Sequence, residues 1–240
     1  MSLPARPPLS LPNPAPLAPP EGFAERLGDI GVHLDAAALD KLGDYLGRLL
    51  AMNEQMNLTA IKDPAEAWER HILDALTLVP LLAELGAKGS IVDVGSGGGV
   101  PGIPLAIARG DLRVTLVEAT QKKAAFLSAV AGALGLGNVA VRAERAELLA
   151  AGDLRGAFDA ATARAVGRLV TLVPQTAPFV RPGGTVLLIK GQRADEELAE
   201  ATRVLAKHRC VHEKTVPTPT GRIVVLRRSA GESRQVARRR

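Results

Sequence analysis

The sequence predicts an α/β fold, in which a helical layer precedes a mostly parallel sheet that ends in an antiparallel strand. Leucines recur at helical spacing in the first third of the chain. Short apolar runs then alternate with helical stretches, and two further apolar runs near the end are joined by a short Pro- and Gly-containing link. The first pattern is typical of amphipathic helices, the second of a helix-covered parallel sheet and the third of a hairpin.

The composition is that of a globular protein. Of the 240 residues, 47% are hydrophobic and 23% are charged, which excludes wholesale disorder and collagen-like repeats. The single cysteine, Cys210, excludes an intrachain disulfide and a multi-cysteine metal site, and we expect it to be a small core residue. We therefore predict a cytoplasmic protein without a metal ion or a membrane span.

The two ends of the chain differ from its middle. Eight of the 17 prolines lie between Met1 and Pro20, so residues 1–22 are predicted to form an extended, disordered arm rather than a signal peptide. Residues 222–240 contain seven arginines and one acid, Glu232, whereas the rest of the chain is close to neutral. The basic tail, 229–240, could bind a polyanion or simply be solvated, and its charge alone does not distinguish the two.

Residues 23–88 are predicted to form a helical extension. Leucines from Leu39 to Leu50 follow helical spacing with charged residues between them. A second helix is expected to begin at Asp63, because an N-cap acid, a proline at the first helical position and Glu66 three residues after the cap form a typical start signal.

Residues 89–228 are predicted to form the sheet domain. A helical stretch separates each run from the next in the first part of this domain, which favours parallel strands. The last two runs are joined by only five residues, too few for a crossover helix, so they must be antiparallel. The seven expected strands are 90–94, 113–118, 138–142, 158–163, 184–190, 210–216 and 222–228.

A glycine-rich turn after the first strand is the strongest functional signal. The strand contains an acid, Asp93, close to its end, and glycines follow at positions that include Gly95, Gly97 and Gly99. Glycines allow a ligand to approach the backbone, and a helix expected to start near Pro101 would direct free amide groups toward the same place. We therefore expect a bound ligand at this turn.

Two ligand classes compete for the turn. Gly97-x-Gly99-x-x-Gly102 matches the dinucleotide fingerprint, and Glu118 lies near the spacing expected for an acid that binds a ribose diol. A pyrophosphate is anionic and does not need Asp93, however, whereas S-adenosylmethionine carries a cationic ammonium and sulfonium. The carboxylate and the terminal antiparallel strand therefore favour S-adenosylmethionine over a nicotinamide dinucleotide.

Six runs, taken together and in order, resemble the RsmG (GidB) family of bacterial small-subunit rRNA guanine-N7 methyltransferases. The resemblance implies a class I, Rossmann-like S-adenosylmethionine-dependent methyltransferase fold with a seven-stranded sheet. It also implies methyl transfer to N7 of a guanine in the decoding-site loop of 16S rRNA, with the rRNA or a small-subunit precursor as partner, and we expect a monomer. The runs are Met56–Ile61, Glu69–Leu76, Val100–Leu105, Glu118–Leu127, Ala163–Val166 and Lys190–Gly191.

The resemblance also implies site residues. Its cofactor residues fall on Gly95, Val100, Glu118, Ala119, Thr120, Ala146, Glu147 and Arg164. Arg164 is in addition our candidate for positioning the substrate, with a structural salt bridge as the alternative. Candidate substrate residues are Asn57, Arg70, His71 and Lys190. Simpler explanations exist for three of them: an Arg70–Asp74 ion pair, a packing role for His71 and a strand-end charge for Lys190. The family commonly has an aspartate where Glu118 stands.

Guanine N7 already presents an in-plane lone pair, so its methylation requires alignment rather than prior deprotonation. The sequence contains no second cysteine, which attack on a pyrimidine ring would need, and no Asp-Pro-Pro-Tyr motif, which is typical of enzymes that methylate exocyclic amines. Three alternatives stay open at this point: a methyltransferase of another RNA or a small molecule, a nicotinamide-dependent oxidoreductase, and a non-catalytic ribosome assembly factor.

Overall fold

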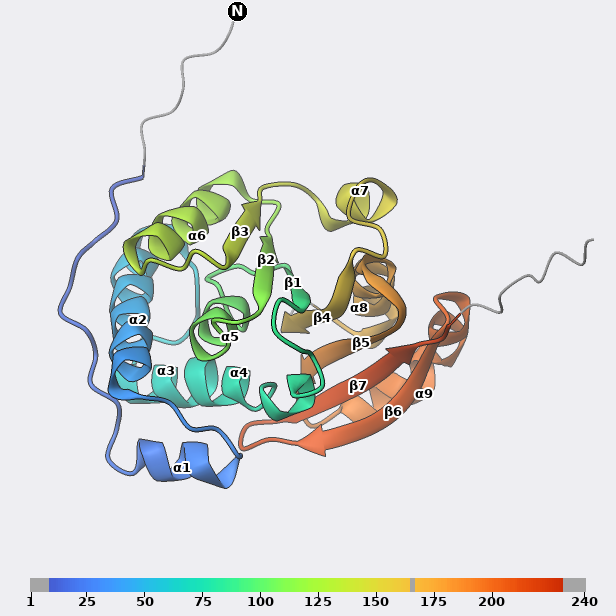
Figure 1. The fold of residues 1–240 in the computed structure, drawn as a ribbon, viewed down its shortest axis with the longest axis horizontal. Helices are drawn as coiled ribbons and strands as arrows, with labels where there is room; N and C mark the ends of the chain where they lie inside the picture. Colours follow the sequence, from blue (N-terminus) through green and yellow to red (C-terminus); the bar gives the residue numbers. More distant parts are fainter. Residues whose placement is uncertain (1–8, 165–166, 231–240) are drawn as a thin grey trace, which may run out of the picture.

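A single seven-stranded sheet forms the centre of the molecule (Figure 1). The computed structural model describes residues 9–164 and 167–230. The strand order is β3-β2-β1-β4-β5-β7-β6. The strands are β1 (Ser90–Val94), β2 (Arg113–Val117), β3 (Val139–Arg142), β4 (Phe158–Arg164), β5 (Val180–Lys190), β6 (Cys210–Pro217) and β7 (Arg222–Arg228).

The strand directions confirm the predicted mixed sheet. The pairs β1–β2, β2–β3, β1–β4 and β4–β5 are parallel, whereas β7 runs antiparallel to both β5 and β6. All seven predicted strands are present, and the largest difference is an earlier start of β5. The short link between β6 and β7 leaves no room for a crossover helix, so the chain must reverse direction there.

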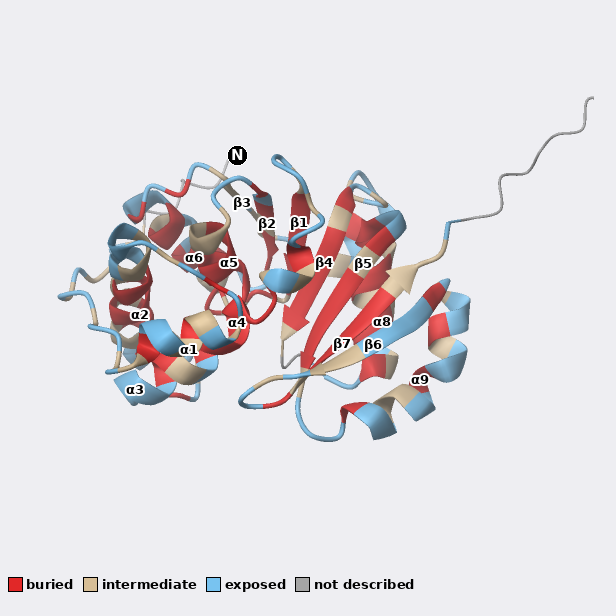
Figure 2. Cartoon of the chain, turned by 60° about the horizontal axis from the view of Figure 1, so that its bottom comes forward, coloured by how far each residue is buried: buried red, intermediate tan, exposed pale blue. Residues whose placement is uncertain are grey.

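Helices cover both faces of the sheet. On one face α2, α5 and α6 pack together, and on the other face α7, α8 and α9 do. In Figure 2 the strands between these layers are mostly buried, while the edge strand β6 is largely exposed. The helices are α1 (Phe23–Asp29), α2 (Ala36–Met56), α3 (Pro64–Ala67), α4 (Asp74–Leu76), α5 (Gly102–Ala108), α6 (Gln121–Ala133), α7 (Ala146–Ala151), α8 (Leu169–Thr176) and α9 (Ala194–Lys207).

Three helical turns of other types complete the described elements: a π-helical turn, η1 (Trp68–Leu73), between α3 and α4, and two 3₁₀ turns, η2 (Pro80–Leu82) and η3 (Ala177–Phe179). The helix predicted from Asp63 begins there, with the Asp63 side chain accepting a hydrogen bond from the Glu66 amide at 2.8 Å. The π-helical turn is not visible in the sequence pattern. Such turns are rare and occur often at functional sites.

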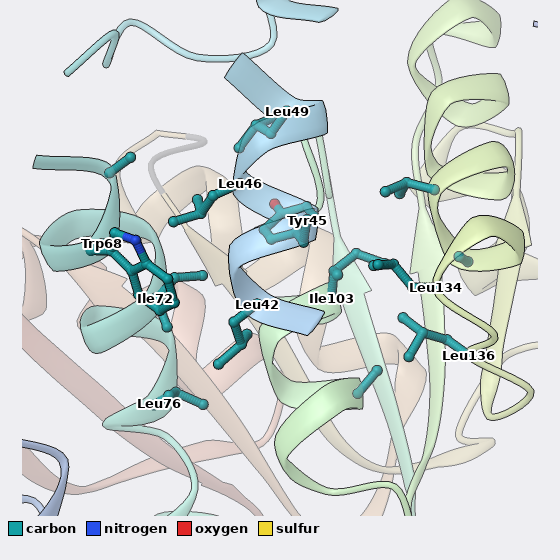
Figure 3. Close-up of a cluster of buried hydrophobic side chains, with 14 of the residues drawn as sticks. Leu42, Tyr45, Leu46, Leu49, Trp68, Ile72, Leu76, Ile103, Leu134 and Leu136 are labelled. Atoms are coloured by element: carbon teal, nitrogen blue, oxygen red, sulfur yellow. The ribbon is translucent and has the colours of Figure 1, made fainter. Parts of the chain in front are cut away.

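The amphipathic helix α2 joins the helical layer to the sheet domain. Figure 3 shows its buried side chains between two groups, with Trp68, Ile72 and Leu76 on one side and Ile103, Leu134 and Leu136 on the other. The facing residues of α2 are Leu42, Tyr45, Leu46 and Leu49, all fully buried. The helical layer and the sheet therefore share one hydrophobic cluster, and truncating one of these large side chains to alanine would cost about 2–5 kcal/mol.

The proline-rich segment differs from the disordered arm expected for residues 1–22. Residues 9–20 lie alongside α2 (Figure 1), where the Leu17 amide donates to the Gly43 carbonyl at 3.1 Å and Arg48 donates to the Pro12 carbonyl at 3.0 Å. The prolines do keep the segment extended. Its docking site is a groove that Gly43 and Gly47 leave on α2, and nothing in the arm's own composition reveals it.

Residues 1–8 and 231–240 lie outside the described residues, so most of the predicted basic tail does too. The division into an arm (1–22), a helical extension (23–88), a methyltransferase domain (89–228) and a tail (229–240) stays a prediction. Within the described residues, no helix combines the length and apolarity needed to span a bilayer.

Replacing Gly43 with alanine is expected to lower the free energy of unfolding by about 1–3 kcal/mol, the cost of an overpacked site. The new Cβ would lie 2.3 Å from the Leu17 carbonyl oxygen and would push the arm off α2. Urea unfolding measures the change. The control is Gly132→Ala on α6, where a Cβ meets nothing within 4 Å and where alanine favours the helix. Equal effects of the two substitutions would contradict the docking of the arm.

Candidate functional site

The predicted ligand-binding turn lies at the carboxyl edge of the parallel strands, where open α/β sheets bind ligands. It opens onto a cavity of about 300 Å³, at the lower end of the range for ligand pockets. Larger cavities occur elsewhere, but the glycine turn does not line them. The cavity is lined by Leu49, Leu58, Thr59, Ala60, Ile61, Arg70, His71, Gly95, Ser96, Gly97, Gly98, Val100 and Arg164.

The turn is held between the sheet and α2. The amides of Gly95 and Ser96 both donate to the Val117 carbonyl of β2, at 2.9 and 3.1 Å. From the other side, the Tyr45 hydroxyl donates to the Gly98 carbonyl at 2.9 Å. Gly97 has a φ of 56°, and a Cβ there would meet no atom closer than 3.8 Å. Because Gly97 adopts the left-handed conformation and has open space where a side chain would be, a ligand can approach its backbone.

Asp93 has a different role from the one predicted. Its side chain lies beneath the turn, with the residue 1% exposed, and does not line the cavity. One carboxylate oxygen accepts from the Gly102 amide and the other from the Thr162 hydroxyl, each at 3.2 Å. Burial raises the pKa of Asp93 to about 6. The residue therefore holds the turn onto the start of α5, and it takes the helix amide that we expected to face the ligand.

Glu118 lies beside the turn, as its spacing predicts. One oxygen of its carboxylate accepts from the Gly97 amide at 2.9 Å, and the other accepts from the Thr120 amide at 2.8 Å. The side chain thus joins the turn after β1 to the end of β2, while Ala119 and Thr120 are exposed next to it. Each carboxylate oxygen retains a lone pair that can accept from a ribose hydroxyl.

Arg164 and His71 meet at the cavity. A guanidinium nitrogen of Arg164 lies 2.8 Å from His71 Nδ1, and another donates to the Arg70 carbonyl. The other ring nitrogen, Nε2, lies 2.8 Å from the Thr59 hydroxyl. Burial, together with the nearby charge of Arg164, lowers the pKa of His71 to about 3. The ring is therefore neutral near pH 7, and both of its nitrogens are engaged.

The simpler explanation for Arg70 and Asp74, a mutual ion pair, is wrong. Arg70 pairs with Glu66 at 3.2 Å on the surface, and Asp74 is buried and accepts a hydrogen bond from Thr220. Arg70 lies in the π-helical turn, which ends immediately before Asp74. The same turn contains His71, which faces the cavity.

The remaining predicted site residues do not line the cavity. Asn57 lines a neighbouring hollow. Glu147 accepts from the Gln175 amide at 2.9 Å, beside Ala146 at the start of α7, so their contact with adenine stays a prediction. Lys190 forms a largely buried ion pair, because its ammonium lies 2.8 Å from the Glu197 carboxylate. The side chain of Lys190 is 7% exposed and that of Glu197 is 14% exposed. It is therefore not placed to contact phosphate as predicted.

Cys210 is placed as the sequence predicts. Cys210 is buried in the core, where burial raises the pKa of its thiol to about 11. Within residues 9–164 and 167–230, no group of three or more His, Cys, Asp or Glu side chains is arranged to hold a metal ion. Sequence reasoning missed Thr59 as an individual residue of the cavity, although it lies in a run that carries the family resemblance.

The strand order, together with the glycine turn that Glu118 joins to the end of β2, defines a Rossmann-like class I methyltransferase fold. Among solved structures, the ribosomal protein L11 methylase of Lactobacillus delbrueckii subsp. bulgaricus superposes with a TM-score of 0.51 at 18% identity. The match covers 65% of this chain and 77% of that one, and it supports the fold alone.

Sequence comparison gives the family. The model of the family described as rRNA small subunit methyltransferase G matches residues 38–224, and the chain belongs to this family. The ribosomal RNA small subunit methyltransferase G of Sorangium cellulosum (strain So ce56) is 70% identical over 230 residues, 96% of each chain. That of Halorhodospira halophila (strain DSM 244 / SL1) is 41% identical and covers 87% of this chain and 96% of its own. S-adenosylmethionine is the methyl donor, so the nicotinamide-dependent oxidoreductase alternative is wrong.

The His71→Gln variant is expected to lose less stability in acid than the wild type. Below pH 6.5 the unfolded chain protonates this histidine and the folded chain does not, so acid favours unfolding until the pH reaches about 3. Between pH 7.5 and pH 5 this linkage removes about 2 kcal/mol from the wild type. The raised pKa of Asp93 has the opposite effect, because its protonation in acid favours the folded chain. Asp93 is present in both proteins, so it does not affect the comparison.

Urea unfolding at pH 7.5 and pH 5 measures this difference. His33→Gln is the matched control, because His33 is exposed. If the wild type and His71→Gln lose the same free energy of unfolding between pH 7.5 and pH 5, the result would contradict a buried, neutral His71.

Proposed function

We propose that this protein transfers the methyl group of S-adenosylmethionine to N7 of a guanine in the decoding-site loop of 16S rRNA. Family membership and the names of the relatives support small-subunit rRNA as the substrate. We further propose that the protein acts as a cytoplasmic monomer on the rRNA or on a small-subunit precursor.

One observation favours N7 over atoms that carry a proton. Three titratable groups close to the turn are already engaged: His71 is neutral with both nitrogens hydrogen-bonded, and the carboxylates of Asp93 and Glu118 accept from backbone amides. None of these three groups is placed to take a proton from the substrate. The acceptor should therefore bring its own lone pair, as guanine N7 does, so that the site only has to align it.

The residues in and beside the cavity are our candidates to hold the methyl donor. The open side of Gly97, next to Gly95, Gly99 and Val100, would accommodate its amino-acid portion, and Glu118 with Ala119 and Thr120 would bind its ribose. When bound, S-adenosylmethionine supplies an electrophilic methyl group on a sulfonium. Ala146 and Glu147 stay our candidates for the adenine.

Two arginines are suited to RNA. Arg70, whose side chain is 54% exposed, lines the mouth of the cavity and can contact phosphate. Arg164 reaches the cavity from the end of β4, where hydrogen bonds to the Arg70 carbonyl and to His71 fix its guanidinium. A fixed planar donor group is suited to positioning a substrate rather than to taking up a proton.

Arg164→Ala is expected to lower kcat about 10- to 100-fold, the effect of losing a charged hydrogen-bonding group. The assay incubates small-subunit rRNA that lacks the modification with the protein and S-adenosylmethionine, and then maps N7-methylguanine by borohydride reduction and aniline cleavage. Arg164→Lys serves as the matched control, because it keeps the charge without the planar fork and should restore little activity.

Adenosylhomocysteine binding by the variants checks that the cofactor site is intact. Methylation by the wild type at an atom other than guanine N7 would refute the proposed function. Wild-type turnover by Arg164→Ala would refute the role of Arg164 alone.

A further inference from the structure

We propose that the Thr59 hydroxyl donates a hydrogen bond to O6 of the target guanine and so selects guanine over adenine. This inference rests on the proposed function and assigns a specificity-determining residue to the same site. It follows from the direction of a chain of hydrogen bonds that begins at Arg164.

The direction is fixed at Arg164, because a guanidinium can only donate. His71 Nδ1, 2.8 Å from it, must therefore accept, and the proton of the neutral ring must be on Nε2. Nε2 then donates to the Thr59 hydroxyl oxygen at 2.8 Å. The opposite tautomer would place two donors against each other at Arg164.

The Thr59 oxygen accepts a second hydrogen bond, from the Ile61 amide at 3.0 Å. A hydroxyl oxygen has two lone pairs and one proton, so both acceptor positions are used and only the proton is left to bond. Among the described residues, no acceptor lies within hydrogen-bonding distance of this hydroxyl besides His71 Nε2, which is already the donor. The chain of hydrogen bonds thus ends in a donor without a protein acceptor.

Thr59 lines the same cavity as the glycine turn, so this donor lies beside the space for the substrate. The loop that carries it is held in place, because the Thr59 amide donates to the Asn53 side-chain oxygen at 2.8 Å. Burial lowers the pKa of His71 and keeps the ring neutral, which maintains the direction of the chain across the physiological pH range. The hydroxyl is therefore preorganised as a donor before substrate binds.

The chemistry of the base identifies the acceptor. Guanine presents two neighbouring acceptors, N7 and O6, whereas adenine presents N7 and an amino donor at the position of O6. If N7 faces the methyl group, O6 is the adjacent atom that can accept from Thr59. Adenine would instead bring its amino group against the hydroxyl donor, and a buried donor without a partner is penalised.

The test combines a protein change with a base change. RNA fragments carry either guanosine or 2-aminopurine riboside at the target position, and the latter keeps N7 but lacks O6. For the wild type, removal of O6 should lower kcat/KM about 3- to 10-fold, the worth of one neutral hydrogen bond. On guanosine, Thr59→Val should lower kcat/KM by a similar factor. For this variant, replacing guanosine with 2-aminopurine should not lower kcat/KM further.

Two further variants separate the hydroxyl from packing. Thr59→Ser keeps the hydroxyl and should retain the penalty for loss of O6, whereas Thr59→Ala should behave like Thr59→Val. Adenosylhomocysteine titration confirms that each variant keeps the cofactor site.

The outcomes distinguish this inference from the proposed function. The wild type could form N7-methylguanosine while 2-aminopurine lowers kcat/KM equally in the wild type, Thr59→Val and Thr59→Ala. That result would overturn the role of Thr59 alone. Absence of N7-methylguanosine from the wild-type reaction would overturn the proposed function, and this inference with it.

Discussion

The site depends on two carboxylates that bind the backbone of one turn. Asp93 fixes the turn from below through the Gly102 amide, and Glu118 fixes it from the side through the Gly97 amide. A turn this rich in glycine would lose much conformational entropy on ordering, and these hydrogen bonds offset part of that cost. Because both acids lie at strand ends of the parallel sheet, the sheet itself sets the geometry of the ligand site.

The helical layer extends the same organisation to the side of the cavity where we propose that the substrate binds. Helix α2 packs on the sheet domain through one leucine-rich face and places Tyr45 and Leu49 against the turn. The loop that follows α2 brings Thr59 to the cavity, and the π-helical turn brings His71. The proposed cofactor and substrate sides are therefore parts of one packed unit, in which Arg164 connects β4 to the helical layer.

Much of this arrangement could be predicted from the sequence, because it depends on local signals. Alternating apolar runs gave the strands, the Asp63–Glu66 signal gave a helix start, and the spacing from Gly95 placed Glu118 beside the turn. Features set by tertiary contacts could not be predicted. The burial of Asp93 and the docking of the arm on Gly43 each depend on a partner distant in the sequence. The pairing of Lys190 with Glu197 depends on how the chain turns between β5 and α9.

The most direct measurement is calorimetric titration of the protein with S-adenosylhomocysteine and with NAD. We predict that the wild type binds adenosylhomocysteine and not NAD, and that Glu118→Ala weakens this binding about 10- to 100-fold while Glu118→Asp largely retains it. Binding of NAD at this cavity, or an affinity for adenosylhomocysteine that is unaffected by Glu118→Ala, would contradict it.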